Sequence, residues 1–170
     1  GYMELLNRKS TRLANYDYSN ENYYFITICT HNRQMLFGNV GNGLDHSEIK
    51  LNHYGEIAKN ELLNIPNHFE GVRIDKYVIM PDHIHAIIVI GCDGKTERSR
   101  PFPTLSAIVG LYKSGVSKLI HEIEPDIKIW QKSFNDRIIR NEQGYREVWQ
   151  YIEENSLKWD EDCFYHAQNK

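Results

Sequence analysis

Tyr77-Val-Ile-Met-Pro-Asp-His-Ile-His-Ala-Ile-Ile-Val-Ile90 is the stretch of this chain that decides the fold. Its aliphatic and β-branched residues are typical of a buried strand. Side chains two positions apart on a strand share a face, so His83 and His85 project side by side, with Ile87 and Val89 beyond them. The opposite face carries only apolar side chains, which are Ile84, Ala86, Ile88 and Ile90. We therefore expect both faces of this strand to be covered.

Two imidazoles in a covered strand need polar partners. When they are held in parallel they form half of a metal site. The alternative is a pair of core histidines bonded to the backbone, or a chance pair in a chain with eight histidines. The strand by itself leaves these interpretations open.

The bulk composition fits one globular domain. The chain has 170 residues, of which 41% are apolar, and this is enough for a sizeable core. It contains no apolar run of about 18 residues, so no membrane span is expected. The three cysteines, Cys29, Cys92 and Cys163, form no Cys-x-x-Cys pair. This favours a reducing, cytoplasmic location and argues against a cysteine-based zinc site.

The predicted order of elements indicates an α+β fold. When the hairpin is set aside, the order is β-α-β-β-α-β-α, and its first six elements match the ferredoxin-like split βαβ arrangement with an antiparallel sheet. The expected elements are a strand over 23–30, an inserted hairpin within 34–51, a helix capped by Asn52 and stopped by Pro66, strands over 72–80 and 83–90, a loop over 91–103, a helix opened by Thr104, a strand over 133–140 and a last helix, 142–155, capped by Asn141.

The last helix completes a candidate site. Its core stripe is predicted to be Tyr145, Val148, Trp149 and Ile152. Tyr151 lies on the flank of this stripe, and Asn155 lies one turn further on. An ordinary flanking tyrosine and a C-terminal asparagine cap would look the same. Combined with His83 and His85, however, Asn155 gives two nitrogen ligands and one oxygen ligand, a set that suits Mg²⁺ or Mn²⁺. A tyrosine beside an open metal position is a possible nucleophile toward phosphorus.

At this point the chain resembles the REP-associated tyrosine transposases, a group of the single-tyrosine HUH transposases. Met80-Pro-Asp-His-Ile-His85 followed by Tyr151-Ile-Glu-Glu-Asn155 is the strongest part of the match. The other matching pieces are Arg8-Lys-Ser-Thr-Arg-Leu13, Tyr16-Asp-Tyr18, Tyr24-Phe-Ile-Thr-Ile-Cys-Thr-His31, Leu36-Phe-Gly38, Trp130-Gln-Lys-Ser-Phe134, Asp136-Arg-Ile-Ile-Arg140 and Lys158-Trp159.

The resemblance implies a metal-dependent endonuclease and strand transferase that acts on single-stranded DNA carrying a REP-like hairpin. In this family, the tyrosine that Tyr151 matches forms a 5′-phosphotyrosine, and the released 3′-hydroxyl can later reseal the DNA. His83, His85 and Asn155 match the ligands of Mg²⁺ or Mn²⁺. Residues 1–170 would then form one domain, as a monomer or a homodimer, with 1–20 as a DNA-contacting arm.

Basic residues are the candidate DNA contacts. Residues 91–140 carry nine basic and six acidic side chains on a chain of net charge −3, which is compatible with a specific polyanion site. The predicted contacts are Arg8, Lys9, Arg12, Lys113, Lys118, Arg137 and Arg140. Two other functions stay open, namely a catalytically silent hairpin-DNA-binding regulator and a metal-dependent phosphoesterase without a covalent step.

The N-terminal basic segment generates a test. If Arg12 reads a base, Arg12→Ala should weaken binding of hairpin DNA by about 1–3 kcal/mol and relax the preference for the 5′ extension. Competition assays with scrambled 5′ extensions measure both effects. Equal affinity of variant and parent for preferred and scrambled oligonucleotides would remove this segment from the recognition site.

Overall fold

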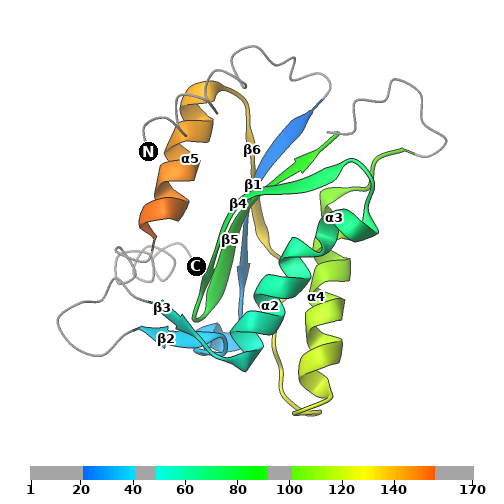
Figure 1. Ribbon diagram of the computed structural model, residues 1–170, viewed down its shortest axis with the longest axis vertical. Coiled ribbons are helices and arrows are strands. Elements are labelled where there is room, and N and C mark those ends of the chain that lie inside the picture. The colour runs from blue at the N-terminus through cyan, green and yellow to red at the C-terminus, as the bar shows by residue number, and fades with distance from the viewer. Residues whose placement is uncertain (1–20, 41–48, 92–100, 156–170) are drawn as a thin grey trace.

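A four-stranded antiparallel sheet forms the centre of the computed structural model, which describes residues 21–40, 49–91 and 101–155 (Figure 1). The strands lie in the order β4-β5-β1-β6. Their bounds are β1 Asn22–Cys29, β4 Val72–Met80, β5 His83–Ile90 and β6 Asn135–Ile139. The predicted mixture of helices with an antiparallel sheet is therefore confirmed.

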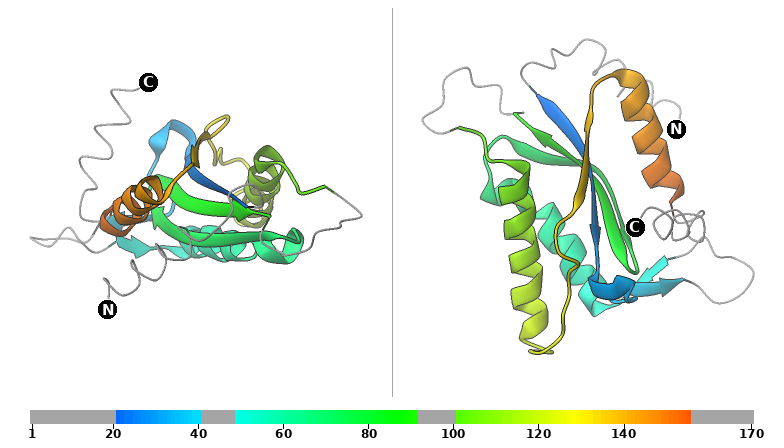
Figure 2. Two further views of the ribbon diagram at one scale, coloured as in Figure 1. Left: turned by 90° about the horizontal axis from the view of Figure 1, so that it is seen from above. Right: turned by 180° about the vertical axis from the view of Figure 1, so that it is seen from behind.

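The remaining elements surround this sheet. A hairpin of β2 and β3 and a short 3₁₀ helix, η1, lie near one end of it (Figure 1). Helices α2, α3 and α4 lie on one side of the sheet, and α5 lies on the other side (Figure 2). The bounds are η1 His31–Arg33, β2 Gly38–Val40, β3 Ile49–Leu51, α2 His53–Leu63, α3 Ile65–His68, α4 Leu105–His121 and α5 Glu142–Glu154. No helix in the described ranges is long and apolar enough to cross a bilayer.

Strand β5 alternates between two cores, as its sequence predicts. Ile84, Ala86, Ile88 and Ile90 belong to the larger core, which α2 and α4 cover. Ile87 and Val89 belong to a smaller core with the buried stripe of α5. Every residue of β5 is buried. The strand therefore has its register fixed twice, because a shift by one residue would exchange the two faces.

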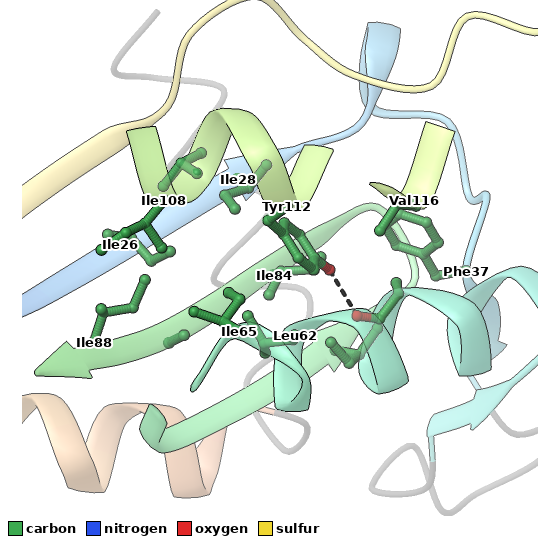
Figure 3. Close-up of a cluster of buried hydrophobic side chains, with 14 of the residues drawn as sticks. Ile26, Ile28, Phe37, Leu62, Ile65, Ile84, Ile88, Ile108, Tyr112 and Val116 are labelled. Carbon is green, nitrogen blue, oxygen red and sulfur yellow. Dashed lines mark hydrogen bonds between the residues drawn. The ribbon is translucent and has the colours of Figure 1, made fainter. Parts of the chain in front are cut away.

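The larger core is shown in Figure 3, where side chains from β1, β5, α2 and α4 meet. Its one labelled polar side chain is Tyr112, whose hydroxyl donates to the Ala58 carbonyl at 2.8 Å. Burial raises the pKa of this phenol well above its ordinary value. Each aliphatic side chain buried here contributes about 1.5–3 kcal/mol.

The predicted helix starts are also confirmed. The side chains of Asn52, Thr104 and Asn141 each accept a hydrogen bond from the backbone N–H three residues on, which satisfies a donor of the first turn. Pro66 behaves differently from the prediction. Helix α2 ends at Leu63, and Pro66 lies in the first turn of α3, where a proline costs no hydrogen bond.

A β-bulge in β4 connects the sheet to α5. Ile74 pairs with Ile88 and Lys76 pairs with Ile87, so Asp75 is an extra residue. The buried Asp75 carboxylate accepts from the Tyr145 hydroxyl of α5 and from Arg73 Nη1 at 2.7 Å.

Lys76, the residue after the bulge, adds two further contacts with α5. Its Nζ lies 4.0 Å from the centre of the Trp149 ring, a cation–π contact. The same ammonium forms an ion pair with Glu153. Together with Asp75, Lys76 fixes where α5 lies on the sheet.

The contact between Asp75 and Tyr145 should dominate the anchoring of α5. We expect Tyr145→Phe to lower the free energy of unfolding by about 1.5–3 kcal/mol, because it removes a hydrogen bond to a buried charge. Tyr112→Phe is the matched control, since it removes a buried hydrogen bond to a neutral carbonyl and should cost about 0.5–1.5 kcal/mol. Urea unfolding followed by circular dichroism compares the two variants, and a smaller loss for Tyr145→Phe than for Tyr112→Phe would contradict the anchoring role.

Candidate active site

His83 and His85 lie side by side on β5, on the face that α5 covers. Their ring centres are 4.6 Å apart, with the ring planes inclined by 70°. Both side chains are buried, at 0% and 1% exposure. The structure therefore gives the arrangement that the alternation of the strand predicts.

Each imidazole is held through its Nδ1 atom. His83 Nδ1 lies 2.7 Å from Asp82 Oδ1, and His85 Nδ1 lies 2.9 Å from the hydroxyl of Thr27 on β1. A carboxylate only accepts hydrogen bonds, so the contact with Asp82 requires a proton on Nδ1 of His83. The lone pair of His83 is then on Nε2, the nitrogen that a metal would use.

Asp82 is itself held by Arg33 of η1. Arg33 Nε donates to Asp82 Oδ2 at 3.0 Å, and both side chains are largely buried. Burial alone would raise the pKa of Asp82, but the hydrogen bonds from His83 and Arg33 outweigh it, and the pKa is lowered. Asp82 therefore presents a stable negative charge to the ring of His83.

Tyr151 of α5 lies over the same part of the sheet. The centre of its ring is 5.3 Å from that of His85 and 6.0 Å from that of Phe25 on β1. Phe25 is also 5.3 Å from His85, so the three rings form one cluster. Tyr151 is half-buried, whereas the core stripe of α5 is buried as predicted: Tyr145, Val148, Trp149 and Ile152.

Asn155 follows α5 and is completely buried. Neither its side-chain oxygen nor its side-chain nitrogen has a hydrogen-bond partner among the described residues. A buried side-chain amide without partners costs about 1–3 kcal/mol. The oxygen and nitrogen of Asn155 are therefore candidate contacts for a ligand.

The donor set of His83, His85 and Asn155 fits Mg²⁺ or Mn²⁺ in chemistry, since it offers imidazole nitrogen and amide oxygen. The described part of the chain has no cluster of three or more His, Cys, Asp or Glu side chains that could hold a metal ion. A metal site on the histidine pair would therefore need a ligand of another type, and the buried side-chain amide of Asn155 is the residue that the sequence predicts for it.

The predicted DNA contacts fall into three groups. Arg8, Lys9 and Arg12 lie outside the described residues. Arg137 pairs with Phe25, so it lies on the site face of the sheet, and it is exposed. Arg140 is exposed directly after β6.

The two lysines of α4 lie elsewhere, because α4 packs on the opposite face of the sheet. Lys118 is exposed there. Lys113 Nζ donates to the carbonyls of Gln131 at 3.1 Å and Ser133 at 2.6 Å, and burial lowers its pKa. Lys113 therefore supports the chain before β6, and the structure does not bring either lysine to the histidines.

Four residues of the site were not singled out from the sequence. Asp82 and Arg33 support His83, while Thr27 and Phe25 line the site from β1. The alternation of β1 does carry a signal, because Phe25 and Thr27 are two apart and pair with Ile87 and His85. Arg33 carries none, since its place depends on the path of the chain after β1.

Comparison with known proteins finds a sequence relative and several solved structures of similar fold. No family model matches the chain. An uncharacterized protein of Haemophilus influenzae is 36% identical over 171 residues, covering 93% of each chain.

Two of the similar structures are described as transposases. A REP-associated tyrosine transposase bound to a REP hairpin has a TM-score of 0.52 and 20% identity, covering 81% of this chain and 67% of the other. A Deinococcus radiodurans protein proposed to be a transposase has a TM-score of 0.50 and 17% identity, covering 82% of this chain and 93% of the other. The chain thus belongs to the same family as the Haemophilus influenzae protein and has the fold of these two structures.

Proposed function

We propose that this chain is a DNA transposase that cleaves single-stranded DNA next to a hairpin, with Tyr151 as the nucleophile and His83, His85 and Asn155 as ligands of Mg²⁺ or Mn²⁺. The observation that carries this proposal is the placing of the Tyr151 ring 5.3 Å from that of His85, one turn before the buried amide of Asn155. A phenol beside potential metal ligands is the minimum equipment for covalent attack on a phosphodiester.

The fold supports the proposal. The strand order β4-β5-β1-β6 is the one expected for a ferredoxin-like split βαβ sheet, with α5 as the added helix that carries the tyrosine. One neighbour with this fold is a transposase bound to a REP hairpin. We extend that kind of DNA partner to this chain as part of the proposal, and with it the use in DNA transposition and recombination.

The proposed cleavage is an in-line displacement at phosphorus. Tyr151 Oη attacks the phosphodiester, and its proton passes to water or to a base. The new bond joins Oη to phosphorus, and the bond from phosphorus to the 3′-oxygen breaks. The products are a 5′-phosphotyrosine and a 3′-hydroxyl, which can later attack the phosphotyrosine and restore both the DNA and the phenol. A bound Mg²⁺ or Mn²⁺ would supply a Lewis acid for the phosphate oxygens.

The chain's own residues prepare this step. The rings of Phe25 and His85 both pack against the Tyr151 ring in T-shaped contacts. The contact with Asp82 puts the proton of a neutral His83 on Nδ1 and leaves Nε2 to a ligand, while Thr27 holds the ring of His85 through its Nδ1. Arg137 is exposed on the same face, and we assign it to a phosphate of the incoming strand as part of the proposal.

The nucleophile has a direct test. Tyr151→Phe should abolish the covalent protein–DNA adduct and cleavage, while the affinity for DNA stays nearly unchanged, because only one hydroxyl is removed. A library of hairpin oligonucleotides with 5′ extensions, incubated with Mn²⁺, gives the adduct on denaturing gels and in mass spectra.

Tyr145→Phe is the matched control: its hydroxyl bonds Asp75 and not the histidine site, so the variant should be less stable but, where folded, should keep forming the adduct. If the adduct persists in Tyr151→Phe, or is lost in a folded Tyr145→Phe, the assignment of Tyr151 as the nucleophile is wrong. Tight binding without cleavage by the parent would favour a silent DNA-binding regulator. Phosphate-ester hydrolysis without an adduct would favour a phosphoesterase.

The metal site has a separate test. His83→Ala and His85→Ala should each remove measurable Mn²⁺ binding in calorimetric titrations, and a chelator should stop cleavage by the parent. His53→Ala is the control, since His53 is an exposed histidine at the start of α2. Unchanged Mn²⁺ affinity in both site variants would refute the metal site.

A further inference from the structure

We propose that Asp82, held in place by Arg33, is a positioning residue that sets the tautomer and the orientation of His83. This inference rests on the proposed metal site and assigns a supporting role to two residues that are not ligands. It starts from the two competing neighbours of His83 Nδ1: Asp82 Oδ1 at 2.7 Å and Arg33 Nη2 at 3.3 Å.

These two neighbours demand opposite tautomers. A carboxylate accepts, so the contact with Asp82 needs a proton on Nδ1. A guanidinium only donates, so a hydrogen bond from Arg33 needs a lone pair on Nδ1 and places the proton of a neutral ring on Nε2. The contact with Asp82 is shorter and involves a negative charge, so it decides the outcome. The Nε2 lone pair of His83 then points to the ligand rather than to the support.

Arg33 has a second effect through Asp82. Asp82 is the residue before the proposed ligand His83. A free Asp82 carboxylate would therefore be an alternative ligand for the cation. Both of its oxygens are engaged, however, because Oδ1 faces His83 and Oδ2 accepts from Arg33 Nε at 3.0 Å. The guanidinium therefore keeps Asp82 turned toward the ring of His83.

The backbone conformation around Arg33 is consistent with its contact to Asp82. Asn32 and Arg33 both have a φ of 54°, a left-handed conformation that non-glycine residues adopt at a cost. The backbone of Asp82 also stabilises this turn, because its carbonyl accepts from Thr30 N–H and from Thr30 Oγ1, both at 3.0 Å. The turn after β1 is thus bonded to the same residue that its arginine supports.

The hydrogen bond at His85 Nδ1 is with a neutral group. Its Nδ1 neighbour is the neutral Thr27 hydroxyl at 2.9 Å, which can donate or accept. We therefore expect the two histidines to differ, with His83 fixed by a charge and His85 by a neutral group.

The tautomer can be measured without any metal. In protein labelled with ¹⁵N-histidine at about pH 8.5, two units above the ordinary imidazole pKa, NMR distinguishes a proton on Nδ1 from one on Nε2. The His83 signal is assigned from its loss in His83→Gln. The parent should carry the proton on Nδ1. Asp82→Ala should move it to Nε2, because Arg33 then donates to Nδ1, whereas Arg33→Met should leave it on Nδ1.

Mn²⁺ titration is the second readout. Asp82→Ala should weaken Mn²⁺ binding by about 10–100-fold, the usual effect of losing a partner behind a ligand. Asp82→Asn, which keeps an acceptor oxygen but not the charge, should lose less and serves if Asp82→Ala does not fold. The control is Asp136→Asn, an exposed aspartate of β6, which should bind Mn²⁺ like the parent.

The outcomes separate this inference from the proposed function. If the His83 proton stays on Nδ1 in Asp82→Ala, or if Mn²⁺ affinity is unchanged in Asp82→Ala and Asp82→Asn while His83→Ala abolishes it, the positioning role is refuted and the metal site stands. If His83→Ala and His85→Ala bind Mn²⁺ like the parent, the metal site of the proposed function fails. A proton that moves to Nε2 together with weaker Mn²⁺ binding supports the inference.

Discussion

The pairing of β5 with β1 on one side and β4 on the other is the constraint on which the rest of the structure depends. Each pairing fixes a partner for His83 and His85: Cys29 and Thr27 on β1, and Met80 and Val78 on β4. A shift by one residue would turn both imidazoles into the aliphatic core under α2 and α4. Burial of the aliphatic face of β5 therefore stabilises the register that also positions His83 and His85, although the two lie on opposite faces of the sheet.

The second requirement is that α5 stays in place over the histidines. Helix α5 is amphipathic and follows an edge strand, so its apolar stripe alone would allow it to slide along the sheet. The bulge at Asp75 supplies a buried charge that accepts from Tyr145, and Lys76 contacts both Trp149 and Glu153. These contacts are specific in direction, which an apolar surface is not.

The parts of this arrangement that the sequence predicts are those governed by local rules. The alternation of β5, the three side-chain caps and the buried stripe of α5 each depend on spacing along the chain, and all are confirmed. The bulge at Asp75 was not predicted, because an extra residue in one strand is visible only against its partner strand. The support of Asp82 by Arg33 was missed for a similar reason, since it depends on two left-handed residues after β1. The N-terminal segment with Arg8, Lys9 and Arg12 lies outside the described residues, so its assignment stays a prediction.

Buried polar groups such as these lower the free energy of unfolding. The amide of Asn155 has no hydrogen-bond partner among the described residues, which alone is worth about 1–3 kcal/mol against the folded state. The buried imidazoles of His83 and His85 occupy space that aliphatic side chains would fill more favourably. Binding of a cation would return this free energy, because a ligand that binds only the folded state stabilises it. Asp82 and Thr27 also favour binding of a ligand. They hold the rings of His83 and His85 in place beforehand, so less conformational entropy is lost on binding.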